Sequence, residues 1–213
     1  MQVHVSAEPR ASGRPRAAIL LKGPALAVAW LAAHALIGCY RLGAFSFLTS
    51  SRLLALVPGA FGIRVRRYWY RGTLARCGED LVVEWLTALK TADARIGSRV
   101  AIGPMCWIAE VEIGDDVMIG SRVAIQGGGR THGFDRVDIP MNQQPGQLST
   151  VVIGRDVWIG TGATVMADVA EGTIVGAGAV VTSTFPSFSI LGGVPARVIG
   201  HRGSPPARDN EDA

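Results

Sequence analysis

The fold is decided by the stretch IGRDVWIGTGATVMADVAEGTIVGAGAVVT, which runs from Ile153 to Thr182. Its first Ile-Gly pair, Ile153-Gly154, is followed six residues later by Ile159-Gly160, and an aliphatic-Gly pair occurs again at Val175-Gly176. An upstream block carries the same pair at Ile96, Ile102, Ile113 and Ile119. A six-residue period of an aliphatic residue followed by Gly is typical of a parallel β-helix.

The period also predicts how the helix is built. Six residues form one short strand and a turn, and three such units close a triangular coil of about eighteen residues. The aliphatic side chain of each unit points inward, and Gly suits a crowded corner. Because one coil cannot bury its own face, stability comes from the stack. We therefore expect an all-β domain over residues 77–200, with its first strand between Cys77 and Thr91 and a polar tail at 201–213.

The two parts of the chain differ in charge. Residues 1–76 carry eleven Lys or Arg and one acid, whereas residues 77–213 carry ten Lys or Arg and sixteen acids. A segment that is both basic and apolar favours an anionic membrane surface over nucleic acid, since the repeats offer no basic groove and no series of stacking aromatics. The three cysteines are far apart and form no CxxC motif, which fits a reducing cytoplasm: Cys39, Cys77 and Cys106.

The N-terminal segment predicts a membrane-associated element. Residues 1–16 have the composition of a disordered lead-in, and residues 17–76 are basic, apolar and helical in character. Arginines flank its second apolar patch, with aromatic rings among them, as is typical of the headgroup level: Arg41, Arg52, Arg64, Arg66, Arg67 and Arg71, with Tyr68, Trp69 and Tyr70. We expect one or two helices lying in or dipping into the cytoplasmic leaflet of the inner membrane.

Three alternatives remain for this segment. The uninterrupted apolar run from Pro24 to Tyr40 reaches the lower limit of about 17 residues for a single membrane span. The helices could instead form a cap packed on one end of the repeat domain. Finally, Leu36 to Cys39 is similar to a lipoprotein processing site, which would change the compartment.

The repeat is interrupted from Gln126 to Val152, and this long irregular loop contains His132. Insertions of this length in a compact repeat fold are usually functional or disordered. The loop has a Gly-rich start, then His132, Phe134-Asp135, Ile139-Pro140 and Gln143-Gln144, and the chain then returns to the repeat. The other histidines lie outside the repeat region, at His4, His34 and His201.

The repeats and the order of motifs in this loop resemble the hexapeptide-repeat acyltransferases, and in particular the branch that O-acetylates polysaccharide sugars, of the colanic-acid type. The resemblance implies a left-handed parallel β-helix and makes His132 the general base, with Asp135 and Gln143 on the acceptor side. It also implies a homotrimer, in which each coenzyme groove lies between two subunits. The chemistry is reasonable in itself, because imidazole can take the proton from an attacking hydroxyl at neutral pH. Asp135 is also a candidate to fix the tautomer of His132.

The second repeat block resembles the acetyl-CoA-binding half of that family. The resemblance implies a groove for the pantetheine arm lined by Trp158, Gly160, Thr161, Ala177 and Thr182, with Arg197 at the coenzyme phosphates. Trp158 could instead pack on the coil, and Arg197 could be a solvated charge. Two departures affect this groove: Ser183 stands where the family often has Lys, and the coil at Val165–Val169 is two residues short.

The predicted function is transfer of acetyl from acetyl-CoA, without a metal, to a hydroxyl of a surface polysaccharide or glycolipid. An N-acetyltransferase acting on an amino sugar and a catalytically silent trimeric scaffold are the alternatives. A zinc carbonic anhydrase on the same fold would need three His ligands, and His132 alone lies in the repeat region. The sequence leaves the acceptor open.

Overall fold

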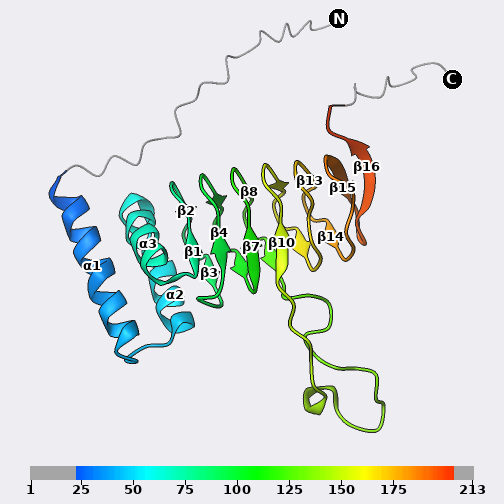
Figure 1. Cartoon of the computed structure of the whole chain (residues 1–213), viewed down its shortest axis with the longest axis horizontal. Coiled ribbons are helices and arrows are strands. Elements are labelled where there is room, and N and C mark those ends of the chain that lie inside the picture. Colours follow the sequence, from blue (N-terminus) through cyan, green and yellow to red (C-terminus); the bar gives the residue numbers. More distant parts are fainter. Residues whose placement is uncertain (1–22, 204–213) are drawn as a thin grey trace, which may run out of the picture.

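The computed structural model describes residues 23–203 and shows three helices at the N-terminal end of a β-helix (Figure 1). The helices are α1 (Pro24–Arg41), α2 (Phe47–Ala55) and α3 (Gly59–Thr73). The expected lead-in at 1–16 and most of the expected tail at 201–213 lie outside the described residues. The last strand ends at His201, so the repeat domain ends one residue later than we expected.

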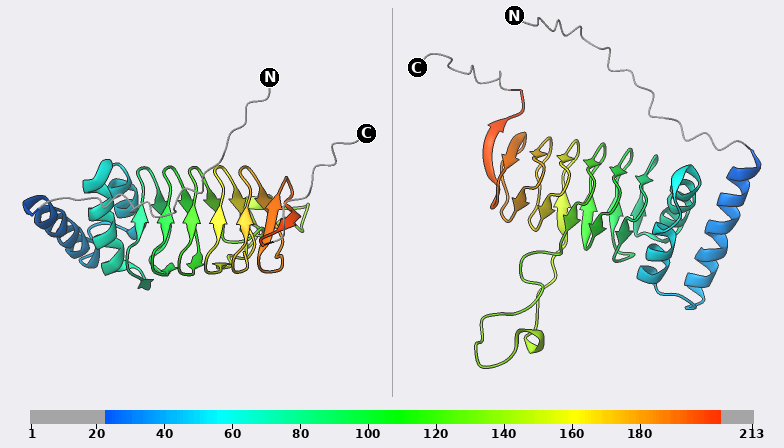
Figure 2. Two further views of the ribbon diagram at one scale, coloured as in Figure 1. Left: turned by 90° about the horizontal axis from the view of Figure 1, so that it is seen from above. Right: turned by 180° about the vertical axis from the view of Figure 1, so that it is seen from behind.

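The strands form three sheets, and each full coil adds one strand to every sheet (Figure 2). The first sheet contains β1 (Arg76–Cys77), β4 (Arg95–Ile96), β7 (Val111–Ile113) and β10 (Val151–Ile153). The second contains β2 (Val82–Val83), β5 (Ala101–Ile102), β8 (Met118–Ile119), β11 (Trp158–Ile159), β13 (Ile174–Val175), β15 (Ser189–Gly192) and β16 (Arg197–His201). The third contains β3 (Ala88–Leu89), β6 (Trp107–Ile108), β9 (Ala124–Ile125), β12 (Thr164–Val165) and β14 (Val180–Val181).

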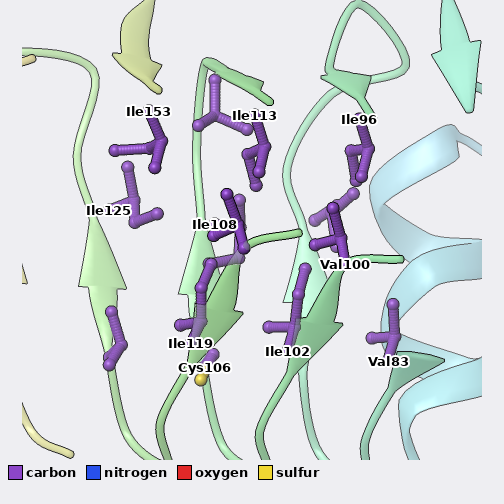
Figure 3. Close-up of a cluster of buried hydrophobic side chains, with 14 of the residues drawn as sticks. Val83, Ile96, Val100, Ile102, Cys106, Ile108, Ile113, Ile119, Ile125 and Ile153 are labelled. Carbon is purple, nitrogen blue, oxygen red and sulfur yellow. The ribbon is translucent and has the colours of Figure 1, made fainter. Parts of the chain in front are cut away.

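The six-residue period sets the register between coils. In the second sheet Ile102 pairs with Ile119, Ile119 with Ile159, and Ile159 with Val175, all in parallel strands. The side chains of Ile102 and Ile119 point into the centre of the coil (Figure 3), and Ile102 and Ile159 have no exposed surface. The predicted parallel β-helix is therefore confirmed, and its core is the stack of first-position residues.

The glycines at the second position are required by contact between coils. A Cβ on Gly103 would lie 2.8 Å from the carbonyl carbon of Gly120, and one on Gly160 would lie 2.5 Å from the nitrogen of Ala177. These glycines do not have positive φ; the left-handed residues come two positions later, as at Met105 (φ 60°). The crowding that we predicted at this position is thus present, but it comes from the neighbouring coil.

The short coil at Val165–Val169 closes without disturbing the stack. Val169 is buried and forms an isolated parallel bridge with Ile153 in place of a full strand. The carboxylate of Asp168 accepts a hydrogen bond of 2.8 Å from the backbone N–H of Val152. The missing residues therefore shorten one side of the triangle and leave the inward position filled.

Helices α2 and α3 cover the open edge of the first coil. Arg66, which is fully buried, donates from Nε to the carbonyl of Val83 at 2.8 Å, and Arg67 donates to the carbonyl of Leu81 at 2.6 Å. In the third sheet the hydroxyl of Ser51 accepts from the N–H of Leu89 at 3.0 Å. Edge strands leave such groups unpaired unless another element satisfies them.

The alternative of a helical cap is therefore confirmed for α2 and α3, and our placement of their residues at the headgroup level was wrong for the buried members. Trp69 and Tyr70 have no exposed surface and pack with Phe47, rather than facing lipid. The Tyr70 hydroxyl lies 2.8 Å from that of Ser51. Sequence composition could not separate these residues from interfacial ones, because both settings favour arginine beside aromatic rings.

Helix α1 lies outside the cap and packs on α3 through Ala29, Ala33 and Ile37. Its other face exposes Trp30 and Leu31, and no charged residue occurs between Pro24 and Tyr40. Within residues 23–203 no helix combines the length and the apolar character that a membrane span requires. Cys39, from the motif similar to a lipoprotein site, lies inside this helix.

Candidate functional site

The interruption projects from the stack as one long loop between β9 and β10 (Figure 1). At its base, the N–H of Ser149 donates to the carbonyl of Gly127 at 3.0 Å, and that of Gln147 to the carbonyl of Arg130 at 2.8 Å. The strand β10 begins at Val151, so the irregular part ends two residues before the boundary that we predicted. The two arms of the base thus pair with each other and fix the point at which the loop leaves the coil.

His132 lies beside a hollow of about 400 Å³ at this base. We call the stacked residues that follow β3, β6, β9, β12 and β14 the loop corner. They are Lys90, Ala109, Gln126, Met166 and Thr182. The backbone N–H of each of the first four donates a hydrogen bond to the last strand residue before the corresponding position on the next coil. The first three line the hollow from the β-helix side. From the loop side it is lined by Thr131, His132, Gly146 and Leu148, and Trp107, Glu110 and Gly127 complete the wall.

An ion pair forms part of the wall of this hollow. Lys90 Nζ lies 2.8 Å from Glu110 Oε1, whereas Glu110 Oε2 is buried and has no hydrogen-bond partner among residues 23–203. A Cβ on Gly127 would lie 2.6 Å from Oε2, so Gly leaves the space that this oxygen faces. A buried acceptor without a donor is costly, on the order of 1–3 kcal/mol. Such an atom is suited to accept a hydrogen bond from a bound hydroxyl.

The side chain of His132 is exposed and makes no hydrogen bond to any other residue between 23 and 203. Asp135, our candidate to orient it, instead pairs with Arg130 at 2.9 Å, and both of these side chains are mostly exposed. The guanidinium of Arg130 also lies over the ring of Phe134, 4.9 Å from its centroid. The Asp135 carboxylate therefore stabilises the outer loop, and proximity in sequence was a poor guide to the partner of His132.

The outer loop is held by Gln144 rather than by its neighbour Gln143. Gln144 is buried; its Oε1 accepts from the N–H of Arg136, and its Nε2 donates to the carbonyls of Arg136 and Ile139. Gln143, which we placed on the acceptor side, is exposed in a short 3₁₀ turn (Met141–Gln143). Gln144 is therefore the structural member of the pair, and Gln143 remains free to contact a ligand.

The predicted coenzyme residues fall into separate places on one chain. Gly160 and Thr161 follow β11, and Ala177 stands against Gly160 on the next coil. They thus share the corner between the second and third sheets. Trp158 is half exposed on the second sheet, where it lines a hollow of about 150 Å³.

The other two coenzyme residues lie elsewhere. Thr182 belongs to the loop corner, and Arg197 is exposed on β16 with a hydrogen bond to the carbonyl of Ala196. The structure therefore groups Gly160, Thr161 and Ala177, and separates them from His132 by the length of the third-sheet strands.

Sequence reasoning missed Lys90, Trp107 and Glu110. Each follows or occupies a third-sheet strand, and counting the repeat from Gln126 back by one coil leads to the segment Trp107 to Glu110. The period thus contained a signal for their position, although not for the pairing of Lys90 with Glu110. Among residues 23–203 no three His, Cys, Asp or Glu side chains are placed to hold a metal ion.

Comparison with known proteins finds relatives that are similar in sequence over the repeats and solved structures that share the fold. The chain is 37% identical over 101 residues to WbbJ of Escherichia coli K12, which is named as an O-acetyl transferase of lipopolysaccharide biosynthesis; the match covers 43% of this chain and 50% of that protein. No family model matches the chain. The structure of a maltose O-acetyltransferase from Clostridium difficile superposes with a TM-score of 0.62 at 21% identity, over 85% of this chain and 90% of the other. The chain is therefore similar in its repeats to curated acetyltransferases and shares the fold of the maltose O-acetyltransferase.

A hexapeptide-repeat-containing acetyltransferase of Vibrio cholerae, whose structure holds acetyl coenzyme A, superposes with a TM-score of 0.52 at 18% identity over 84% of this chain and 89% of the other. At such identity the likeness shows the fold alone. The alignments span between 37% and 62% of the lengths of five curated relatives, all named as acetyltransferases.

Proposed function

We propose that the protein transfers the acetyl group of acetyl-CoA to a hydroxyl of a sugar in a surface polysaccharide or glycolipid. The observation that carries this proposal is the position of His132, whose side chain has no hydrogen-bond partner among residues 23–203, beside a hollow where Oε2 of Glu110 also has no partner within those residues. A free imidazole can remove a proton, and the carboxylate can accept a hydrogen bond from a polyhydroxy ligand. The likeness to WbbJ supports the choice of a glycan acceptor.

The reaction requires one proton transfer by the protein. His132 takes the proton of the acceptor hydroxyl as the oxygen attacks the thioester carbonyl. The carbon–sulfur bond then breaks, the acetyl group remains on the acceptor oxygen, and the proton passes from the imidazolium to the departing thiolate. Lys90 and Glu110 line the part of the hollow that binds the acceptor. The proposed reaction uses no metal.

We further propose that the site is completed by a second subunit. On one chain, the cluster of Gly160, Thr161 and Ala177 lies at the opposite end of the third-sheet strands from the His132 hollow. A homotrimer, as the family resemblance implies, would place the cluster of one subunit against the loop corner of its neighbour. Trp158, Thr182 and Arg197 would then line the same intersubunit groove.

Membrane attachment is retained as a proposal for α1, in a cytoplasmic enzyme held at the inner membrane. The exposed Trp30 and Leu31 face away from the cap, and Arg10, Arg14, Arg16 and Lys22 precede the helix in sequence. An apolar face next to basic residues is suited to an anionic leaflet. Helices α2 and α3 bury their main apolar faces against each other and the first coil, so we assign this role to α1.

The test is release of coenzyme A thiol from acetyl-CoA by the purified full chain with sugars, amino sugars and glycolipids as acceptors. We expect His132→Ala to reduce turnover by about 10²- to 10⁴-fold, and His201→Ala, at the end of β16, to have little effect. Near-normal turnover of His132→Ala would refute the assignment of the base. Turnover with amino sugars alone would identify an N-acetyltransferase, and no turnover of the wild type with any acceptor would favour the silent scaffold.

A further inference from the structure

A second hollow adjoins the His132 site at Trp107. Its volume is about 420 Å³, and Trp107 lines both hollows. One wall comes from α2, through Arg52, Ala55 and Leu56. The other comes from the first coils, through Leu86, Ala88, Met105 and Cys106. The helical cap and the repeat domain therefore line this open hollow together, and Trp107 is shared with the His132 hollow.

The cation in this hollow lacks a counter-ion. The guanidinium carbon of Arg52 lies 5.5 Å from the ring centroid of Trp107. Arg52 makes no hydrogen bond or ion pair with any residue in the described part of the chain, 23–203. Its position in the last turn of α2 suits a positive charge but does not account for its placement over the indole. A guanidinium held on a ring face keeps its N–H groups available for an anionic oxygen.

The rest of the second hollow is apolar, whereas the first is polar. Leu56 and Met105 are both substantially exposed at this wall, and no carboxylate lines it. In the first hollow the charge of Lys90 is already neutralised by Glu110, so that end offers no free cation. Along the surface from His132, the lining thus changes in three steps. Polar groups suited to bind hydroxyls come first, the guanidinium of Arg52 follows beside Trp107, and the aliphatic side chains of Leu56 and Met105 come last.

We propose that the acceptor is a sugar joined through a phosphate to an apolar chain. The sugar occupies the His132 hollow, the phosphate binds Arg52 beside Trp107, and the apolar chain lies over Leu56 and Met105. Phosphate oxygens match the planar fork of a guanidinium. This inference rests on the proposed function for the reacting end, but the binding of the phosphate and the chain can be measured without catalysis.

The binding test uses n-octyl phosphate below its micelle concentration, with inorganic phosphate and octyl glucoside as comparison probes, titrated by calorimetry into the full chain. We expect octyl phosphate to bind more tightly than either comparison probe. We expect Arg52→Gln to weaken it about tenfold or more, because charge-assisted contacts are lost. Leu56→Ser should weaken octyl phosphate but not inorganic phosphate, and Arg71→Gln, an exposed arginine on α3, should change neither.

Equal affinity of wild type and Arg52→Gln for octyl phosphate, or no binding to either, would overturn the proposal. If octyl phosphate bound instead to the exposed face of α1, wild type and Arg52→Gln would have equal affinity, because Arg52 lies on α2. If transfer to sugars fails while Arg52-dependent binding persists, the proposed reaction is wrong and the phosphate site stands. If transfer to a free sugar is efficient and adding an alkyl phosphate to that sugar gives no Arg52-dependent gain in kcat/KM, the acceptor class is wrong and the reaction stands.

Discussion

Replacing Arg66 by Met should detach the helical cap from the β-helix. The side chain is fully buried, and its guanidinium donates to three carbonyls: Val83 at 2.8 Å, Leu54 at 2.8 Å and Val57 at 2.7 Å. Val83 belongs to the first strand of the second sheet, and Leu54 and Val57 lie at the end of α2. One side chain therefore satisfies both the edge of the sheet and the C-terminus of a helix.

The expected cost follows from these three bonds. A hydrogen bond to a charged group is worth about 1.5–3 kcal/mol, so three would give roughly 4–9 kcal/mol if nothing opposed them. Burial of the charge does oppose them: desolvation lowers the pKa of Arg66, and Nη2 has no partner among residues 23–203. Replacement by Met removes the cost of burying the guanidinium and keeps much of the apolar part of the Arg66 side chain. We therefore expect a net loss of about 3–5 kcal/mol, because three carbonyls lose a charged donor while the cost of burying that charge is also removed.

The measurement is unfolding in urea, followed by tryptophan fluorescence for the cap and by far-ultraviolet circular dichroism for the strands. Because Trp107 and Trp158 lie in the β-helix, the cap signal is the contribution of Trp69, measured as the difference from the same protein carrying Trp69→Phe. We expect the fluorescence transition of Arg66→Met to move to lower urea, ahead of the loss of strand signal, because repeat coils are stabilised by their neighbours. Arg71→Met, exposed on the same helix, is the control. A change in unfolding free energy below about 0.5 kcal/mol for Arg66→Met would refute the reasoning.

Two other predictions concern stability. Burial raises the pKa of Tyr70 from 10.0 to about 12, so the unfolded chain releases this proton first; stability should be complete below pH 10 and fall by roughly 2–3 kcal/mol toward pH 12. Urea unfolding of Tyr70→Phe across this pH range should lack that part of the fall, and an unchanged slope would contradict the cause given. Gly160→Ala should destabilise by about 1–3 kcal/mol because the new Cβ meets the backbone of the next coil, whereas Gly38→Ala in α1 meets nothing within 4 Å and should not lower the thermal midpoint. Equal midpoints for these two variants would exclude the clash.

The β-helix could be predicted from the sequence because one rule fixes it. Each first-position aliphatic side chain, such as Ile119 or Ile159, is buried by the same coil geometry, so the period identifies the core without tertiary knowledge. The left-handed corner residues could not be identified in this way. Positions such as Met105 and Arg122 adopt positive φ although they carry side chains, because the coil imposes it, and their residue types give no signal.

The candidate site was predictable only in part. The break in the period located the loop and His132, because an insertion as long as residues 126–150 does not fit within one coil and must project from the stack. The partners inside the loop were not predictable, since Arg130 rather than His132 pairs with Asp135, and Gln144 rather than Gln143 is buried. These choices depend on how the loop folds on itself. The membrane reading of Arg66 failed for a related reason: the open edge of a coil needs donors, and no local pattern shows which donors reach it.

The requirement at the coil edge also connects the cap to the chemistry. A β-helix must satisfy its first coil, and here Ser51 and Arg66 do so by fixing α2 and α3 against it. Fixing α2 in this position places Arg52 over Trp107, which forms a wall of the His132 hollow. On our proposal for the acceptor, the cap forms part of the acceptor side as well as closing the end of the β-helix. A variant that loosens the cap, such as Arg66→Met, should then raise KM for a phosphorylated acceptor more than KM for acetyl-CoA. An equal rise in the two KM values would show that the cap does not contribute to acceptor binding.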